Sequence, residues 1–174
     1  LTYALAANHT LFAGFHRGFS PPRTAQAISS TGQDLELEAE RSWEYELGLR
    51  GYAPCAGCEW LRYEVTGFYY DFDVEIVPAN QSGGAGTADT HAGETRHLGI
   101  ETAITDDLTR LFTGRCDPCR AGWFVDLGYT FVDTENVTPG GLFEGNDLPY
   151  APEHVGWAGL RFESPSGFSA GIVA

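Results

Sequence analysis

The sequence predicts an all-β chain: an antiparallel up-and-down meander of about eight strands that forms part of a transmembrane β-barrel. Three observations predict it. Apolar and polar residues alternate along several segments, these segments are longer than ordinary soluble strands, and short connections alternate with long ones. The chain of 174 residues also has 22 glycines, nine prolines and 13% aromatic residues, a composition typical of β structure with many turns.

The alternation is clearest in four segments. In each of them, large apolar residues recur at alternate positions, and most of the residues between are charged, polar or small. Because successive side chains of a strand point to opposite faces, each segment has one apolar face and one polar face. We expect further strands on both sides of these four, two of them truncated at the chain ends. In chain order, the apolar positions are Trp43, Tyr45, Leu47 and Leu49; Leu61, Tyr63, Val65 and Tyr69; Leu98, Ile100 and Ile104; and Trp123, Val125, Leu127, Tyr129 and Phe131.

The connections and the aromatic residues separate two fold classes. A soluble sandwich would turn its apolar faces inward, whereas a membrane barrel turns them to lipid and girdles them with aromatic residues. The sequence places aromatic residues near the expected strand ends, namely Trp43, Trp60, Tyr69, Tyr70, Trp123 and Trp157. Short connections are expected near 7–9, 53–59, 106–121 and 164–167, and long ones at 20–40, 78–95 and 135–153. This placement and strand length favour the barrel.

Charge and motifs exclude several function classes. The formal net charge is −14 and all ten basic residues are arginines, which argues against a nucleic-acid partner or an anionic membrane surface. No apolar run approaches the length of a transmembrane helix. No GxSxG, HExxH or phosphate-binding loop is present, so we expect neither an enzyme nor a cofactor. The chain begins with Leu1 rather than Met, and we expect it to be part of a longer protein.

Five segments, in this order, resemble TonB-dependent outer-membrane receptors, with the closest likeness to the ferric-citrate type of siderophore receptor. They are residues 11–22 (LFAGFHRGFSPP), 38–51 (EAERSWEYELGLRG), 67–73 (GFYYDFD), 93–101 (GETRHLGIE) and 148–154 (LPYAPEH). The resemblance implies a barrel of about 22 strands with a plugged lumen. Residues 1–174 would then be a partial barrel domain from the later half, without the plug, the TonB box or the remaining strands.

The resemblance implies import rather than catalysis. Such a receptor takes a ferric siderophore, an iron(III)-citrate-like chelate, through the outer membrane of a Gram-negative bacterium. Its partners are the chelate, outer-membrane lipid and, through the plug, the inner-membrane TonB complex. Two alternatives stay open: a soluble secreted β-sandwich stapled by disulfides that serves as a binding module, and a passive porin-like barrel. Isolated residues 1–174 are not expected to form a stable soluble monomer, because the sheet would have open edges and an exposed apolar face.

Candidate ligand-binding residues are His16, Arg17, Arg96 and His97, which stand where strands meet long connections. An arginine facing the lumen could hold an anionic chelate through bidentate hydrogen bonds, and the alternative is an ion pair with a neighbouring strand. Asp71, Asp73 and Glu75 are expected to alternate on one face of their segment and could offer oxygen ligands to calcium. Their spacing fits a solvated face better, and no metal site is predicted.

Four cysteines form two CxxC pairs, Cys55 with Cys58 and Cys116 with Cys119. Two such pairs can supply a zinc tetrahedron, although the 57 residues between the inner cysteines exceed the usual spacing. A redox motif lacks its βαβ context. The family resemblance places both pairs on the oxidising periplasmic side, which favours disulfides over zinc or free thiols. The pairing stays open, because four cysteines allow three connectivities.

Overall fold

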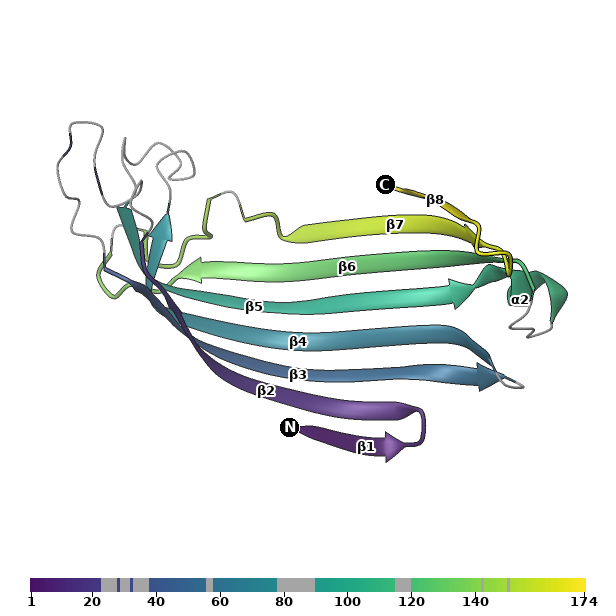
Figure 1. Ribbon diagram of the computed structural model, residues 1–174. Coiled ribbons are helices and arrows are strands. Elements are labelled where there is room, and N and C mark those ends of the chain that lie inside the picture. The colour runs from purple at the N-terminus through teal and green to yellow at the C-terminus, as the bar shows by residue number, and fades with distance from the viewer. Residues whose placement is uncertain are drawn as a thin grey trace.

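A computed structural model describes residues 1–22, 28, 32, 38–55, 58–77, 90–114, 120–141, 143–149 and 151–174. It is an eight-stranded antiparallel sheet in which each strand pairs with the next one in the chain (Figure 1). The all-β meander predicted from the sequence is confirmed. The strands are β1 (Thr2–Ala6), β2 (His9–Ser20), β3 (Glu40–Cys55), β4 (Cys58–Val77), β5 (Thr90–Asp107), β6 (Gly122–Asn136), β7 (His154–Glu163) and β8 (Ser169–Val173).

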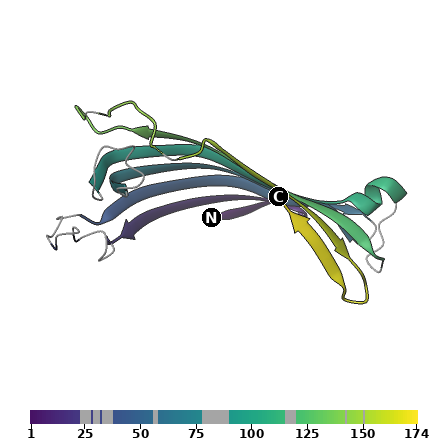
Figure 2. The same ribbon diagram turned by 90° about the horizontal axis from the view of Figure 1, so that it is seen from above.

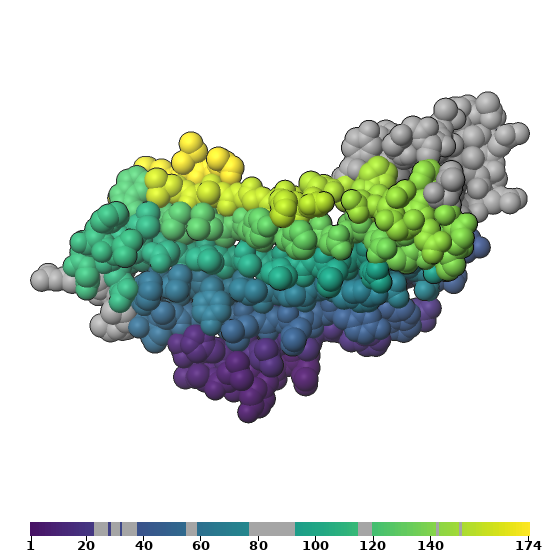
Figure 3. All heavy atoms as spheres, turned by 180° about the vertical axis from the view of Figure 1, so that it is seen from behind, coloured from purple at the N-terminus to yellow at the C-terminus, as the bar shows by residue number. Residues whose placement is uncertain are grey.

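The sheet forms one curved layer, and no second described layer lies over the middle of its strands (Figures 2 and 3). Among the described residues, only Phe68 and Ile76 are buried hydrophobic side chains. The apolar side chains that a soluble sandwich would enclose are exposed instead; Leu47, for example, keeps 58% of its surface. The described part of the chain therefore does not have the two-layer architecture of a sandwich.

Strand length and connection length follow the predicted pattern. The longest strands, β3, β4 and β5, have 16, 20 and 18 residues, well above the usual five or so. The strand ends that short connections join meet at one end of the sheet, which we call the turn end, and the strand ends that long connections join meet at the other, the loop end (Figure 1). β1 and β8 do not pair with each other among the described residues, so the sheet has two open edges.

One short helix, α2 (Leu108–Thr113), lies between β5 and β6 at the turn end and was not predicted from the sequence. Asp107 begins it by accepting a hydrogen bond from the Arg110 backbone N–H at 3.1 Å. Gly114 ends it in the left-handed conformation, with φ of 66°. Within the described residues, no helix has the length and hydropathy needed to cross a bilayer.

Register gives the sheet its two faces. Directly paired residues share a face, and alternation along each strand then assigns the remaining residues to one face or the other. The apolar face carries Leu11, Phe15, Tyr45, Leu47, Leu49, Tyr63, Val65, Tyr69, Leu98, Ile100, Ile104, Trp123, Val125, Leu127, Tyr129, Leu160 and Phe162. The polar face carries Thr10, His16, Glu44, Glu46, Arg50, Glu64, Thr66, Tyr70, His97, Glu101, Thr105, Asp126, Thr130, Thr134 and Arg161. The two-faced strands predicted from alternation are confirmed.

A β-bulge corrects the prediction that Asp71, Asp73 and Glu75 share one face. Pairing of β4 with β5 shifts between Phe72 and Glu75, where one extra residue is inserted in β4. Asp71 pairs with Arg96 on the apolar side, whereas Glu75 bonds to Thr95 on the polar side. The three carboxylates are therefore not a common set of ligands.

Candidate functional site

The apolar face is organised as a band. Along β5 it runs from Leu98 to the start of α2 at Leu108, with Asp106 near its turn end. At about 3.4 Å per residue and a strand tilt of roughly 45°, this length spans about 24 Å, close to the ~25 Å apolar band of outer-membrane barrels. The band therefore has the height needed to cross the hydrocarbon core.

Aromatic clusters border the band at both ends. At the loop end, Phe15 stacks on Trp43 with centroids 5.2 Å apart and contacts Tyr45 at 5.0 Å. At the turn end, Trp123 lies 5.1 Å from Phe162. Amphipathic aromatic rings favour the boundary between hydrocarbon and water, so these clusters agree with the predicted girdles.

Two aromatic residues expected in the girdles lie elsewhere. Trp157 faces the polar side, where its indole covers Gly128, and Tyr70 also belongs to the polar face. Placement near a strand end does not by itself set the face, because adjacent residues of one strand point in opposite directions. The Arg110 guanidinium lies over the Trp60 ring, with Arg110 Cζ 4.1 Å from the centre of that ring.

The two predicted arginines lie on the apolar side, just beyond the band at the loop end. Arg17 pairs with Trp43 in register and holds its guanidinium 4.7 Å from the centre of that ring. Arg96 lies in the same cross-strand row and forms an ion pair with Glu135. This row forms a charged rim at the loop end of the aromatic cluster. The two arginines therefore lie on the opposite face of the sheet from the two predicted histidines.

The two predicted histidines lie on the polar face, in one row across the sheet. Register links the row through His16 on β2, Glu44 on β3, Tyr70 on β4, His97 on β5 and Thr134 on β6. The row crosses the loop-end half of the polar face and carries carboxylate, phenol, imidazole and hydroxyl groups side by side.

Hydrogen bonds fix several of these side chains. His97 Nε2 lies 3.2 Å from Glu75 Oε2, and Thr95 donates to the same carboxylate oxygen. The Tyr70 hydroxyl donates to Glu46 at 3.0 Å. The bulge before Glu75 makes the first contact possible, because it turns that carboxylate onto the polar face. We call His16, Glu44, Tyr70, Glu75 and His97 the loop-end polar cluster.

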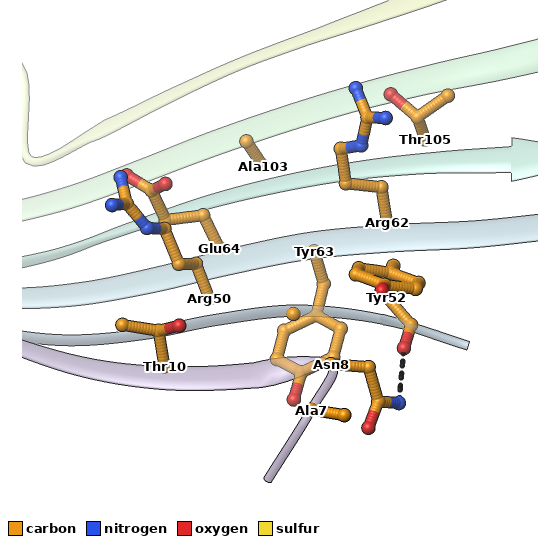
Figure 4. A pocket seen from close by; sticks show the side chains of 11 residues that line it. Ala7, Asn8, Thr10, Arg50, Tyr52, Arg62, Tyr63, Glu64, Ala103 and Thr105 are labelled. Atoms are coloured by element: carbon orange, nitrogen blue, oxygen red, sulfur yellow. Dashed lines mark hydrogen bonds between the residues drawn. The ribbon is translucent and has the colours of Figure 1, made fainter. Parts of the chain in front are cut away.

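A second polar region lies near the turn end and was not predicted from the sequence. Arg50, Arg62 and Glu64 project to the same side of the sheet and, with Tyr52 and Thr105, border an open hollow of about 470 Å³ (Figure 4). The Asn8 amide closes its edge by donating to the Tyr52 carbonyl at 2.7 Å. Further along the face, Arg161 lies 3.3 Å from Asp126, which also accepts from Thr105 at 2.8 Å.

The cysteine predictions are only partly within the described residues. Cys55 and Cys58 end β3 and begin β4, and they pair in register across the tight turn at the turn end. Cys116 and Cys119 lie outside the described residues. Disulfide formation therefore stays a prediction. Among the residues that the structure describes, no three histidine, cysteine, aspartate or glutamate side chains gather in a way that could hold a metal ion.

The polar groups described above lie on an exposed face of the sheet rather than in an enclosed pocket. The polar face offers hydrogen-bond donors, carboxylates and the guanidinium groups of Arg50, Arg62 and Arg161 on its strands, while the opposite face is apolar at membrane height. A family model described as the β-barrel of TonB dependent receptor-like proteins matches residues 1–172. The chain belongs to the TonB-dependent receptor family. The resemblance noted in the sequence is confirmed, and because members of this family are transporters, the expectation that the chain is not an enzyme agrees with it.

Two solved TonB-dependent transporters are similar in structure. Copper transporter OprC has a TM-score of 0.64 and 16% identity, over 99% of this chain and 24% of its own. Ferric citrate transporter FecA, in its unliganded form, has a TM-score of 0.59 and 23% identity, over 99% of this chain and 28% of its own. The chain thus spans about a quarter of these transporters, and the likeness supports the barrel fold.

Proposed function

We propose that the chain is part of the barrel of an outer-membrane receptor that imports a ferric siderophore, an iron(III)-citrate-like chelate, into the periplasm. The observation that carries the proposal is the two-faced wall, whose apolar band has membrane height, in a chain of this family. In the whole receptor, the apolar face would contact outer-membrane lipid of a Gram-negative bacterium. The polar face would line the lumen, and the turn end would face the periplasm.

The loop-end polar cluster is the part of the wall best suited to meet the chelate. His16 and His97 lie on the polar face toward the loop ends of β2 and β5, which would be the side that an incoming ligand meets first. Rigid strands hold them, and binding groups on a rigid scaffold lose little freedom on binding. We propose these two histidines as ligand contacts. Arg17 and Arg96, which lie on the apolar side, would instead hold the outer rim of the membrane band.

Import needs energy, and the inner-membrane TonB complex would supply it through the plug. This chain contributes wall rather than plug, so its own role is to shape the lumen and to capture the ligand. Because the chain carries a net charge of −14, an anionic chelate would need local arginines to offset the repulsion, and the polar face carries Arg50, Arg62 and Arg161.

The test uses the full-length receptor, reconstituted in phospholipid, in binding titrations with ferric citrate, a ferric hydroxamate, a ferric catecholate and cupric ion. Saturable binding of a ferric chelate is the expected result. Binding of cupric ion alone would reject iron as the cargo while leaving the transporter class intact. Uptake by cells that continues after TonB is removed would reject energised import in favour of a passive pore.

A further inference from the structure

The short helix α2 carries apolar side chains that the wall itself does not cover. Phe112 keeps 83% of its surface exposed, and the adjacent Leu111 keeps 69%. Leu108 and Phe112 are four residues apart and therefore lie on one side of the helix. Large apolar side chains gathered in this way are unusual on a surface that meets only water.

These side chains join the apolar face of the sheet. Leu108, Thr109 and Phe112 of α2 border an apolar hollow of about 280 Å³ together with Trp123 of β6 and Leu160 of β7. Trp123 and Leu160 both belong to the apolar face, at the turn end of the band. The hollow is therefore continuous with the membrane-facing surface and lies beside the aromatic cluster of Trp123 and Phe162.

Polar contacts hold α2 in place against the turn end of the sheet. The Thr109 hydroxyl accepts a hydrogen bond from the Trp123 backbone N–H at 2.6 Å. Arg110, two residues from Leu108 and so on the other side of the helix, stacks over Trp60 at 4.1 Å. Arg120 bonds to Thr113 at 2.9 Å and lies 3.2 Å from Asp107. These contacts orient the helix with its apolar side toward the band.

We propose that α2, with the adjoining ends of β6 and β7, forms a seat for an acyl chain of a glycerophospholipid in the leaflet at the turn end. This inference rests on the proposed membrane environment. Continuity with the apolar band favours lipid as the occupant, since a helix with one apolar side at the interface lies in the plane of the headgroup boundary. The seat would fix the depth of the barrel at its turn end, because Trp123 borders both the hollow and the aromatic girdle.

The test places the photocrosslinking residue p-benzoylphenylalanine at position 112 of the full-length receptor in phosphatidylethanolamine membranes, followed by mass spectrometry of the adducts. This substitution of an exposed phenylalanine leaves the wall intact. Matched variants carry the same residue at Leu127, in the middle of the apolar band, and at Val155, on the polar face. Position 112 is expected to yield about tenfold or more phospholipid adduct than position 155, because burying an aromatic side chain in lipid strongly favours that environment.

The three positions separate the possible outcomes. Phospholipid adducts at 112 and 127 but not at 155 would support the seat. Adducts at 127 without adducts at 112 would overturn the seat and leave the proposed membrane environment standing. A lack of adducts at both 112 and 127 would overturn the membrane environment and the seat with it.

Discussion

Tyr63 on β4 and His9 on β2 share a hydrogen bond of 2.8 Å across the strand that separates them. Between them on β3 stands Gly51, which pairs with both residues in register. A Cβ at Gly51 would overlap His9 Nδ1 and approach the Asn8 carbonyl at 2.7 Å and the Tyr63 hydroxyl at 3.0 Å. Glycine at this position thus lets two strands that are not neighbours bond on the apolar face.

Replacement of Gly51 by alanine is therefore expected to destabilise the barrel by about 1–3 kcal/mol, through overpacking and the loss of the half-buried hydrogen bond between Tyr63 and His9. Unfolding of the full-length receptor in phospholipid by urea measures the change. Gly67→Ala is the matched control on the same face, because its nearest neighbour is the Leu47 carbonyl at 3.8 Å. Equal stability of the two variants would contradict the role assigned to Gly51.

A second glycine supports an aromatic ring on the polar face. Gly128 pairs directly with Trp157, and a Cβ there would overlap the indole. We expect Gly128→Ala to lower the free energy of unfolding by roughly 1–3 kcal/mol, since the displaced indole must leave its rotamer. Gly156→Ala serves as its control, with the nearest atom at 3.7 Å. The same urea titration compares the pair, and a larger loss in the control would refute the argument.

Ligand binding should distinguish the two faces at the loop end. His16→Ala and His97→Ala are each expected to weaken binding of the ferric chelate by about fivefold, the value of one hydrogen bond of ~1 kcal/mol. Arg17→Ala should change the affinity by less than about twofold, because its side chain stacks on Trp43 on the opposite face. Titration of each reconstituted variant with the chelate gives the three affinities. A larger loss at Arg17 than at the histidines would reverse the assignment of the faces.

The cysteines give a prediction that needs no ligand. If they form disulfides, then Cys55, Cys58, Cys116 and Cys119 will resist an alkylating agent in the denatured, unreduced protein and react only after reduction. Peptide mass spectrometry of the receptor isolated from membranes measures the modification at each site and also identifies the pairing. Full alkylation of all four before reduction would eliminate the disulfides.

Residues 1–174 expressed alone should not yield a soluble, cooperatively melting monomer. The unpaired edges at β1 and β8 present open hydrogen-bonding groups, and the apolar band stays exposed to water. Size-exclusion chromatography without detergent, followed by thermal melting, gives the answer. A monomer with a cooperative thermal unfolding transition in the absence of detergent would contradict the assignment of the apolar face to the membrane.

The strands could be predicted from the alternation of apolar and polar residues. This contrast, for example between Trp43 and Glu44 or between Leu127 and Asp126, depends only on neighbouring residues in the sequence. Alternation also implies that the adjacent residues His16 and Arg17 point to opposite faces. The prediction that both contact the ligand was inconsistent with this rule. The bulge before Glu75 was beyond sequence reasoning, since it depends on pairing with β5. The helix α2 left a detectable signal in Asp107 and Gly114, which cap it seven residues apart.

The turn-end hollow beside Arg50, Arg62 and Glu64 could not be predicted, because it joins residues from strands whose relative register the sequence does not state. Likewise, the bond between Tyr63 and His9 requires the pairing of three strands to be known. Local pattern thus gives the face of a side chain, whereas its partners follow from the alignment of strands.

Since every strand pairs with the one that follows it, the wall can grow by adding one hairpin at a time. Each addition closes only a short stretch of chain, and such local closure is the least costly in entropy. Each new strand pairs the backbone groups of the edge before it, and its own outer edge stays open until the next strand is added. The loop-end connections can lengthen or change sequence without altering this order of assembly.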